Sequence, residues 1–308
     1  MNFFPFFIKI HCIIFCLALF STSLFSQPDT ALLHLRERII KELSTQKGSF
    51  AVAFKDISTG KKLLINENES FHAASTMKTP VMIEVFRQAS HKKISLGDSV
   101  LIKNEFKSIV DSSSFSLDSA DDSELELYKH IGEKRTISRL VYDMIVASSN
   151  LATNIIIEIV NAKNVTQTMR SYGATGIQIL RGVEDQKAYD KGLNNTTTAY
   201  DLMLIFEKIA TGKAVNKKAS EAMTQILLDQ QFNDIIPAQL PKEVKVAHKT
   251  GFITGIHHDS GIVFLPNGRK YILVLLSKNL ADEKEAVKTM ANISRLIYDY
   301  MISLPGHK

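Results

Sequence analysis

Two groups of apolar, strand-like segments, one near each end of this 308-residue chain, limit what it can fold into. Segments 49–54 and 62–65 lie on either side of a Gly-containing turn, as in a β-hairpin. Further runs occupy 244–250, 260–265 and 271–277, with Pro-Asn-Gly-Arg between the last two. The stretch between the groups is mainly helical in pattern. We therefore predict a mixed α/β (α+β) fold whose antiparallel sheet of about five strands joins both ends of the chain.

Helical periodicity predicts what packs on this sheet. Apolar residues recur at helix spacing over 30–43 and over 283–302. We expect these terminal helices to cover one face and a helical lobe, about residues 68–240, to cover the other. The helices predicted within that lobe are 75–89, 140–147, 151–160, 197–210 and 217–228. The Ser- and Asp-rich segment 112–126 is predicted to be a solvated, mobile loop, and a binding site is expected in the cleft between the lobes.

The first 26 residues have the pattern of a secretory signal peptide. One lysine precedes an apolar core that is short for a membrane span and ends in small polar residues. Both cysteines, Cys12 and Cys16, lie there, so the exported chain is expected to have no disulfide and no thiolate chemistry. We predict cleavage near Ser26, a single domain over 27–308, no stable membrane anchor, and a periplasmic or secreted location.

Charge and composition argue against several partners. The net charge is only +5 and the basic residues are scattered, so nucleic-acid binding is not predicted. His257, His258 and Asp259 are adjacent, but neighbouring strand residues point to opposite faces, and nothing else supplies a matching third ligand motif. We therefore predict no metal and no cofactor, and we expect a monomer.

Ser75 and Lys78 are three residues apart, where a long apolar helix is predicted to begin. A buried lysine with a lowered pKa can remove the proton of a nearby serine hydroxyl, which is otherwise a poor nucleophile. The Ser-x-x-Lys pattern also begins at Ser44, Ser58 and Ser90, each in polar, turn-like surroundings. Only the apolar helix that follows Ser75 and two motifs downstream distinguish this match as a candidate catalytic site.

The downstream motifs are Ser148-x-Asn150, at a predicted helix junction, and Lys249-Thr250-Gly251, at the end of a predicted strand. A serine hydroxyl both donates and accepts, so Ser148 is suited to carry a proton to a leaving group. The glycine allows a ligand to approach the strand edge closely. The order and the placement of the three motifs make the set specific.

This set resembles the penicillin-recognising serine enzymes, most closely the class A β-lactamase group. The resemblance covers nearly the whole exported chain, including the stretches HAASTMK, SSNLATN, NNTTTAYDLM and HKTG. It implies a single catalytic domain with the β-lactamase fold, in which Ser75 is acylated by a β-lactam or by a D-Ala-D-Ala peptide. Lys78 then activates the serine. The backbone N–H groups of Ser75 and Phe252 form the oxyanion hole by analogy.

The resemblance also assigns substrate contacts. Asn150 holds the side-chain amide of the substrate, while Lys249 and Thr250 bind its carboxylate. Class A enzymes carry a glutamate that positions the water for release of the acyl group. Glu184 is the best candidate for that role, with Asp185 next, although the asparagine usual one turn later is not evident.

Two further departures from the class A pattern are visible. The middle motif has Ser149 where aspartate is usual. The usual Arg–Asp clasp of the glutamate loop is expected to become a weaker Arg181–Asn195 pair.

We predict a β-lactamase. One alternative is a D-Ala-D-Ala carboxypeptidase or penicillin-binding protein whose deacylation is slow. Another is a non-catalytic β-lactam or muropeptide receptor, which is acylated once. Glu184 is the residue that separates hydrolysis from slow release.

Overall fold

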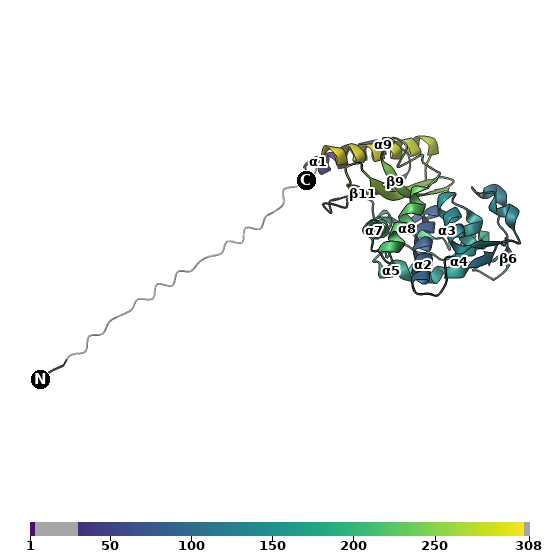
Figure 1. Cartoon of the computed structure of the whole chain (residues 1–308). Coiled ribbons are helices and arrows are strands. Elements are labelled where there is room, and N and C mark those ends of the chain that lie inside the picture. The colour runs from purple at the N-terminus through teal and green to yellow at the C-terminus, as the bar shows by residue number, and fades with distance from the viewer. Residues whose placement is uncertain (4–29, 305–308) are drawn as a thin grey trace.

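A five-stranded antiparallel sheet joins the two ends of the chain in the computed structural model, which describes residues 1–3 and 30–304 (Figure 1). The strand order is β2-β1-β11-β10-β9, so the first hairpin pairs with the last strand of the chain. These strands are β1 (Ser49–Asp56), β2 (Lys62–Ile65), β9 (Lys245–Ile253), β10 (Ile256–Phe264) and β11 (Lys270–Lys278). The predicted fold class and the antiparallel sheet are confirmed.

Both faces of β1 and β11 are buried, which explains why these two strands are apolar at most positions. In β1, Ala51 and Ala53 belong to the hydrophobic core on one face, whereas Phe50, Val52 and Phe54 belong to a second core on the other. Successive side chains of a strand point to opposite faces, so a single apolar run serves both cores.

Helices α1 (Thr30–Leu43) and α9 (Glu283–Ser303) cover one face of the sheet and pack on each other (Figure 1). The buried side of α9 includes Met290, Ile293 and Ile297, which join the second core. Full burial of an apolar side chain of this size contributes about 1.5–3 kcal/mol. The two terminal helices therefore share one face, as the sequence predicts.

The helical lobe packs on the opposite face, where α7 contacts β1, β10 and β11 and α2 is buried along most of its length. The helices of the lobe are α2 (Lys78–Ser90), α3 (Ile137–Val146), α4 (Asn150–Val160), α5 (Ala162–Ser171), α6 (Gln186–Asp190), α7 (Ala199–Ala210) and α8 (Lys217–Leu228). Its short strands are β3 (Phe71–His72), β4 (Ser99–Leu101), β5 (Phe106–Lys107), β6 (Ser114–Phe115), β7 (Lys134–Thr136) and β8 (Thr196–Thr197).

The expectation of a solvated loop over 112–126 fails in part. The segment contains β6 and a 3₁₀ turn, η2 (Ser119–Asp121), and a further 3₁₀ turn, η3 (Leu127–His130), follows it. Leu117 and Asp122 are buried. A Ser- and Asp-rich composition predicts solvent exposure, but it does not reveal that one carboxylate faces inward onto a helix end.

The predicted signal peptide and both cysteines lie almost wholly within residues 4–29, outside the described residues. Across residues 30–304, each helix is either too short or too polar to cross a bilayer.

Candidate active site

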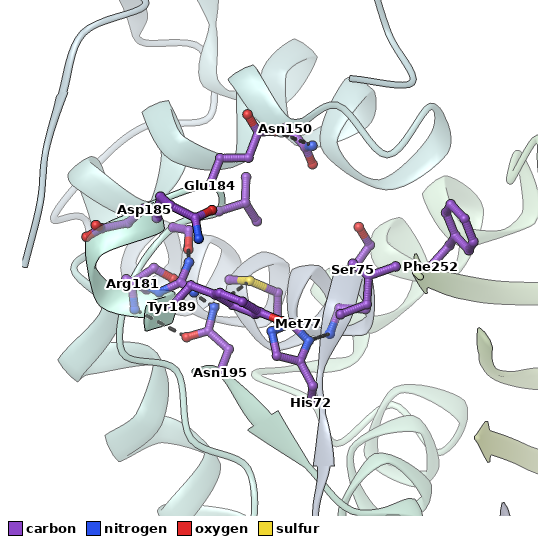
Figure 2. Close-up of a pocket in the computed structure, with 15 residues that line it drawn as sticks. His72, Ser75, Met77, Asn150, Arg181, Glu184, Asp185, Tyr189, Asn195 and Phe252 are labelled. Atoms are coloured by element: carbon purple, nitrogen blue, oxygen red, sulfur yellow. Dashed lines mark hydrogen bonds between the residues drawn. The ribbon is translucent and has the colours of Figure 1, made fainter. Parts of the chain in front are cut away.

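Ser75 lies in the 3₁₀ turn η1 (Ala74–Met77), immediately before α2. Ala74 has a φ of 42°, which is uncommon for a residue with a side chain. Its N–H donates to Nδ1 of His72 at 3.1 Å, which helps to hold this turn. Figure 2 shows Ser75 and His72 among the residues that line the cavity. The predicted helix thus begins as a 3₁₀ turn and becomes an α-helix only from Lys78.

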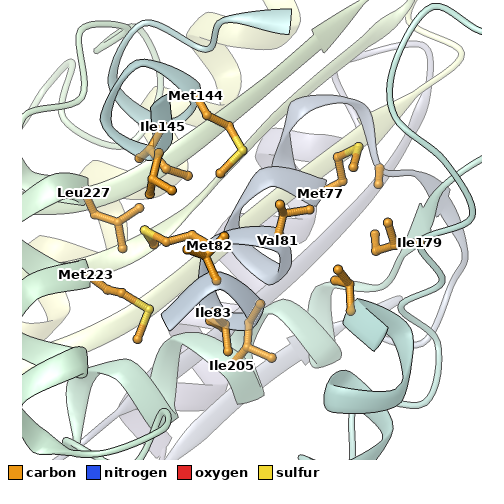
Figure 3. Packing of buried hydrophobic residues seen from close by; sticks show 14 of the residues in the cluster. Met77, Val81, Met82, Ile83, Met144, Ile145, Ile179, Ile205, Met223 and Leu227 are labelled. Atoms are coloured by element: carbon orange, nitrogen blue, oxygen red, sulfur yellow. The ribbon is translucent and has the colours of Figure 1, made fainter. Parts of the chain in front are cut away.

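Lys78 has no exposed surface, because it begins the helix that the core surrounds (Figure 3). Its Nζ donates to the carbonyl oxygen of Ser148 at 2.6 Å, to Oγ of Ser148 at 3.2 Å and to Oδ1 of Asn150 at 2.9 Å. Burial lowers the pKa of Lys78 to about 7, and the negative charges of Asp122 and Glu184 oppose that effect. The amine therefore gains and loses its proton near neutral pH.

The three-residue spacing of Ser75 and Lys78 does not produce a hydrogen bond between them. Within residues 30–304, Ser75 Oγ has no hydrogen-bond partner, while the amine of Lys78 is directed to the loop between α3 and α4. Spacing on a helix fixes which residues share a face, but a buried amine turns toward the acceptors that the tertiary fold supplies.

Ser148 stands between two lysines. It has a φ of 58° and lies in the loop between α3 and α4. Its Oγ is 3.2 Å from Nζ of Lys78 and 3.0 Å from Nζ of Lys249. Burial lowers the pKa of Lys249 well below its usual value, and the nearby charge of Lys78 lowers it further. The Ser148 hydroxyl can therefore exchange a proton with either amine.

The segment from Lys249 to Phe252 belongs to β9, an edge strand that borders the cavity. Lys249 is fully buried, and it also donates to the carbonyl oxygen of Thr250 at 3.0 Å. Gly251 lies against η1, where an added Cβ would be 3.1 Å from the backbone nitrogen of Ser75. Phe252 is 60% exposed. The glycine thus keeps the strand edge and the serine turn in close contact.

Asn150, the first residue of α4, links Lys78 to Glu184. Its Oδ1 accepts from Lys78, and its Nδ2 donates to Oε1 of Glu184 at 2.7 Å (Figure 2). Burial raises the pKa of Glu184, while the hydrogen bond from Asn150 lowers it. Asp185 is buried, caps α6 and accepts from Oγ of Ser108 at 2.9 Å. Glu184 is therefore the better placed of the two carboxylates to act in the cavity.

The expected side-chain pair of Arg181 and Asn195 is wrong in its details. Oδ1 of Asn195 accepts from the N–H of Leu180 at 2.8 Å, and its Nδ2 donates to the carbonyl oxygen of Arg181 at 3.0 Å. The guanidinium instead donates to Oδ1 of Asn194 and to the carbonyl oxygen of Leu193, at 3.1 and 3.0 Å. The Asn195 amide therefore binds the backbone of residues 180 and 181 and makes no hydrogen bond to the Arg181 guanidinium.

Two adjoining cavities, of about 620 and 180 Å³, lie between the sheet edge and the helical lobe. Both are lined by Ser75, Asn150 and Phe252, while Ser148 and Thr250 line the larger one and Glu184 the smaller. The larger volume is that of a small-molecule site.

The three adjacent residues His257, His258 and Asp259 do not converge on one point. Nε2 of His258 donates to the carbonyl oxygen of His72 at 2.9 Å, and burial lowers the pKa of His258 to about 4. Asp259 pairs with His248 at 2.9 Å. No cluster of three His, Cys, Asp or Glu side chains suited to a metal occurs in the described part of the chain. Sequence reasoning missed the link between His258 and His72 because 186 positions separate them.

Ser75 lines a cavity at which the hydroxyl of Ser148 lies within 3.2 Å of the buried amines of Lys78 and Lys249, an arrangement suited to a serine hydrolase. A family model described as the beta-lactamase enzyme family matches residues 34–301, and the chain belongs to that family. The predicted family and enzyme class are confirmed.

Relatives and solved structures agree with this assignment. The chain is 24% identical over 303 residues to beta-lactamase VEB-1 of Pseudomonas aeruginosa, covering 93% of this chain and 96% of that protein. A beta-lactamase from Sphaerobacter thermophilus has a similar fold, with a TM-score of 0.74 and 23% identity over 90% of this chain and 99% of that one. The structure of PBP-A also has a similar fold, with a TM-score of 0.76 and 24% identity over 88% of this chain and 97% of that one. A variant of PBP-A with the same TM-score is described as an acyl-enzyme complex with penicillin G.

Proposed function

We propose that this chain hydrolyses the amide bond of β-lactams through an acyl-enzyme on Ser75. The observation that best supports the proposal is the hydroxyl of Ser148, held 3.2 Å from Lys78 Nζ and 3.0 Å from Lys249 Nζ at a cavity that Ser75 also lines. Buried amines with lowered pKa values supply a base at neutral pH, which a serine nucleophile requires. The family assignment supports the same chemistry.

Acylation begins when Ser75 Oγ attacks the carbonyl carbon of the β-lactam and its proton passes to the neutral amine of Lys78. The N–H groups of Ser75 and Phe252 receive the oxyanion that forms. As the C–N bond breaks, Ser148 gives its proton to the leaving nitrogen and takes one from Lys78. The step ends with an ester on Ser75, an opened ring and a neutral Lys78.

Substrate recognition uses the edge of β9 and the start of α4. Lys249 attracts the carboxylate of the substrate, and Thr250 hydrogen-bonds to it. Asn150 holds the side-chain amide of the substrate. Because Asn150 also contacts Lys78 and Glu184, a substrate bound to its amide lies next to both proton-transfer groups.

Deacylation is assigned to Glu184. Its carboxylate takes a proton from a water molecule whose oxygen attacks the ester carbonyl carbon. The C–O bond to Ser75 then breaks, and the proton held by Glu184 returns the Ser75 oxygen to a hydroxyl, which leaves Glu184 ionised again. Burial raises the pKa of Glu184 and so brings it closer to that of an effective general base.

A D-Ala-D-Ala carboxypeptidase or penicillin-binding protein with slow deacylation is the second candidate. The hydrogen bond of 2.7 Å between Asn150 and Glu184 favours it, because that bond occupies one of the two carboxylate oxygens that could hold a water. A receptor that is acylated once without turnover is the limiting case of the same chemistry.

The nucleophile is tested by labelling purified protein with a fluorescent penicillin. We expect Ser75→Ala to abolish covalent labelling, because no other hydroxyl takes its place. Ser90→Ala is the matched control, since Ser90 begins another Ser-x-x-Lys pattern on the exposed end of α2 and should label like the wild type. Labelling of Ser75→Ala at the wild-type level would refute the assignment.

We also propose that residues 27–308 act as a monomeric catalytic domain after export to the periplasm or the medium. Mass analysis of the protein recovered from those fractions tests this, because cleavage near Ser26 removes both cysteines. A protein that keeps residues 1–26 would contradict it.

A further inference from the structure

Asp122 is a buried carboxylate that the proposed chemistry leaves without a role; it is only 8% exposed. Its two oxygens both accept from the backbone N–H of Asn150, at 3.0 and 2.9 Å. Oδ2 also accepts from the N–H of Leu151 at 2.9 Å and from the hydroxyl of Tyr128 at 3.0 Å. Asp122 therefore connects the segment before η3 to the first turn of α4.

Asp122 supplies a carboxylate that the segment Ser148-Ser149-Asn150 lacks, since Ser149 stands where aspartate is usual in class A enzymes. Ser149 caps α4 by accepting only from the N–H of Ala152, at 3.1 Å, which leaves the N–H groups of the first two helical residues for another acceptor. Asp122 takes both, and a negative charge is favoured at a helix N-terminus. A carboxylate from a separate segment thus completes this helix start.

The anchored turn is the one that carries two proposed functional groups. Ser148, with its φ of 58°, lies two residues before Asn150, so the backbone on one side of this strained loop is fixed by Asp122. The same segment contacts the Asn150 side chain, because the carbonyl oxygen of Asp121 accepts from Nδ2 at 3.5 Å. Movement here would shift the hydroxyl and the amide together.

We propose that Asp122 is a positioning residue that holds Ser148 and Asn150 in place for acylation of Ser75. The inference rests on the proposed function, because it concerns the geometry of that same reaction. Asp122 touches neither substrate nor the reacting atoms; it acts through the first turn of α4, and separately its charge raises the pKa of Lys78. A misplacement of about 1 Å in a catalytic group is sufficient to slow a reaction by about 100-fold.

Asp122→Asn is the main test, because it preserves shape. An amide has only one acceptor atom, so its NH₂ group must face one of the N–H donors that both carboxylate oxygens now accept. Because the substitution also removes a charge that raises the pKa of Lys78, the rate is compared at pH 9, where that amine is neutral in both proteins. We expect the single-turnover acylation rate with benzylpenicillin to fall at least about tenfold at this pH in protein that remains folded.

Asp56→Asn is the matched control. Asp56 is also buried and accepts from a backbone N–H and a hydroxyl, those of Ser58 and Thr59, but it ends β1 and lines neither cavity. It also accepts from the guanidinium of Arg269 at 3.2 Å. Asp56→Asn should lower the melting temperature at least as much as Asp122→Asn does, because it also weakens the ion pair with Arg269, while its acylation rate stays within about twofold of wild type. A wild-type rate in folded Asp122→Asn would overturn the proposal.

Amide hydrogen exchange gives a second readout that needs no substrate. In Asp122→Asn, the N–H groups of Asn150 and Leu151 should exchange at least about tenfold faster, whereas those in the middle of α4 should not change. Unchanged exchange at both positions would also overturn the proposal. If the wild type forms no adduct with benzylpenicillin, the proposed function fails, and the exchange rates still decide whether Asp122 anchors this turn.

Discussion

The acylation rate of this enzyme should depend on pH through the buried amine of Lys78. Burial lowers its pKa to about 7, against the ordinary value of 10.5. That difference corresponds to about 5 kcal/mol between the two protonation states, at about 1.4 kcal/mol per pH unit. About one tenth of the amine is neutral at pH 6 and about nine tenths at pH 8, so acylation should rise about tenfold over this range.

Glu184→Gln allows this rise to be measured without interference from deacylation. The negative charge of Glu184 raises the pKa of Lys78, as does that of Asp122, so removal of one charge should lower that pKa further. The midpoint of the acylation profile should therefore move to a pH below the wild-type midpoint. The midpoint moves in this direction because the negative charge of Glu184 stabilises the protonated amine, so without that charge Lys78 loses its proton at a lower pH.

Stopped-flow acylation with a fluorescent penicillin, in single-turnover conditions from pH 5 to pH 9, measures both midpoints. Circular dichroism at each pH confirms that the protein stays folded. A rate that is flat from pH 6 to pH 8, or a Glu184→Gln midpoint above that of the wild type, would refute the role given to Lys78.

Two other predictions concern the cavity walls. Glu184→Gln should let the acyl-enzyme accumulate, which intact mass would show, and an unchanged turnover would exclude Glu184 from deacylation. Asp185→Asn should chiefly lower the melting temperature, because the Asp185 carboxylate caps α6. Gly251→Ala would bring a Cβ to 3.1 Å from the backbone nitrogens of Ser75 and Thr76, and it should slow acylation at least about tenfold by moving the oxyanion donor. A wild-type acylation rate in folded Gly251→Ala would show that η1 tolerates the added methyl group.

The fold was largely predictable from the sequence because its patterns are strong. The two buried strands β1 and β11 are apolar at most positions, and α1, α8 and α9 keep regular helical spacing. Helix α5 was missed because its sequence is mostly polar, and only Val165, Thr168 and Met169 are buried in it. Tertiary packing decides the conformation of such a segment.

The motifs indicated residues that the structure brings close together, but they did not indicate the contacts between them. Motif order identified Ser75, Lys78 and Ser148, yet the amine of Lys78 bonds to Ser148 and Asn150 because the α3–α4 loop surrounds it. Asp122 had no local signal, since it lies among other acidic and serine residues and its partners are 28 and 29 positions away. Such contacts depend on how distant segments pack.

The most direct test of the central claim is the intact mass of the mature protein followed over time after benzylpenicillin is added. We predict a penicilloyl adduct that requires Ser75, and that appears and then disappears within seconds while hydrolysed drug accumulates. An adduct that persists for hours would instead indicate a penicillin-binding protein or receptor, and the absence of any adduct would contradict the proposed acyl-enzyme.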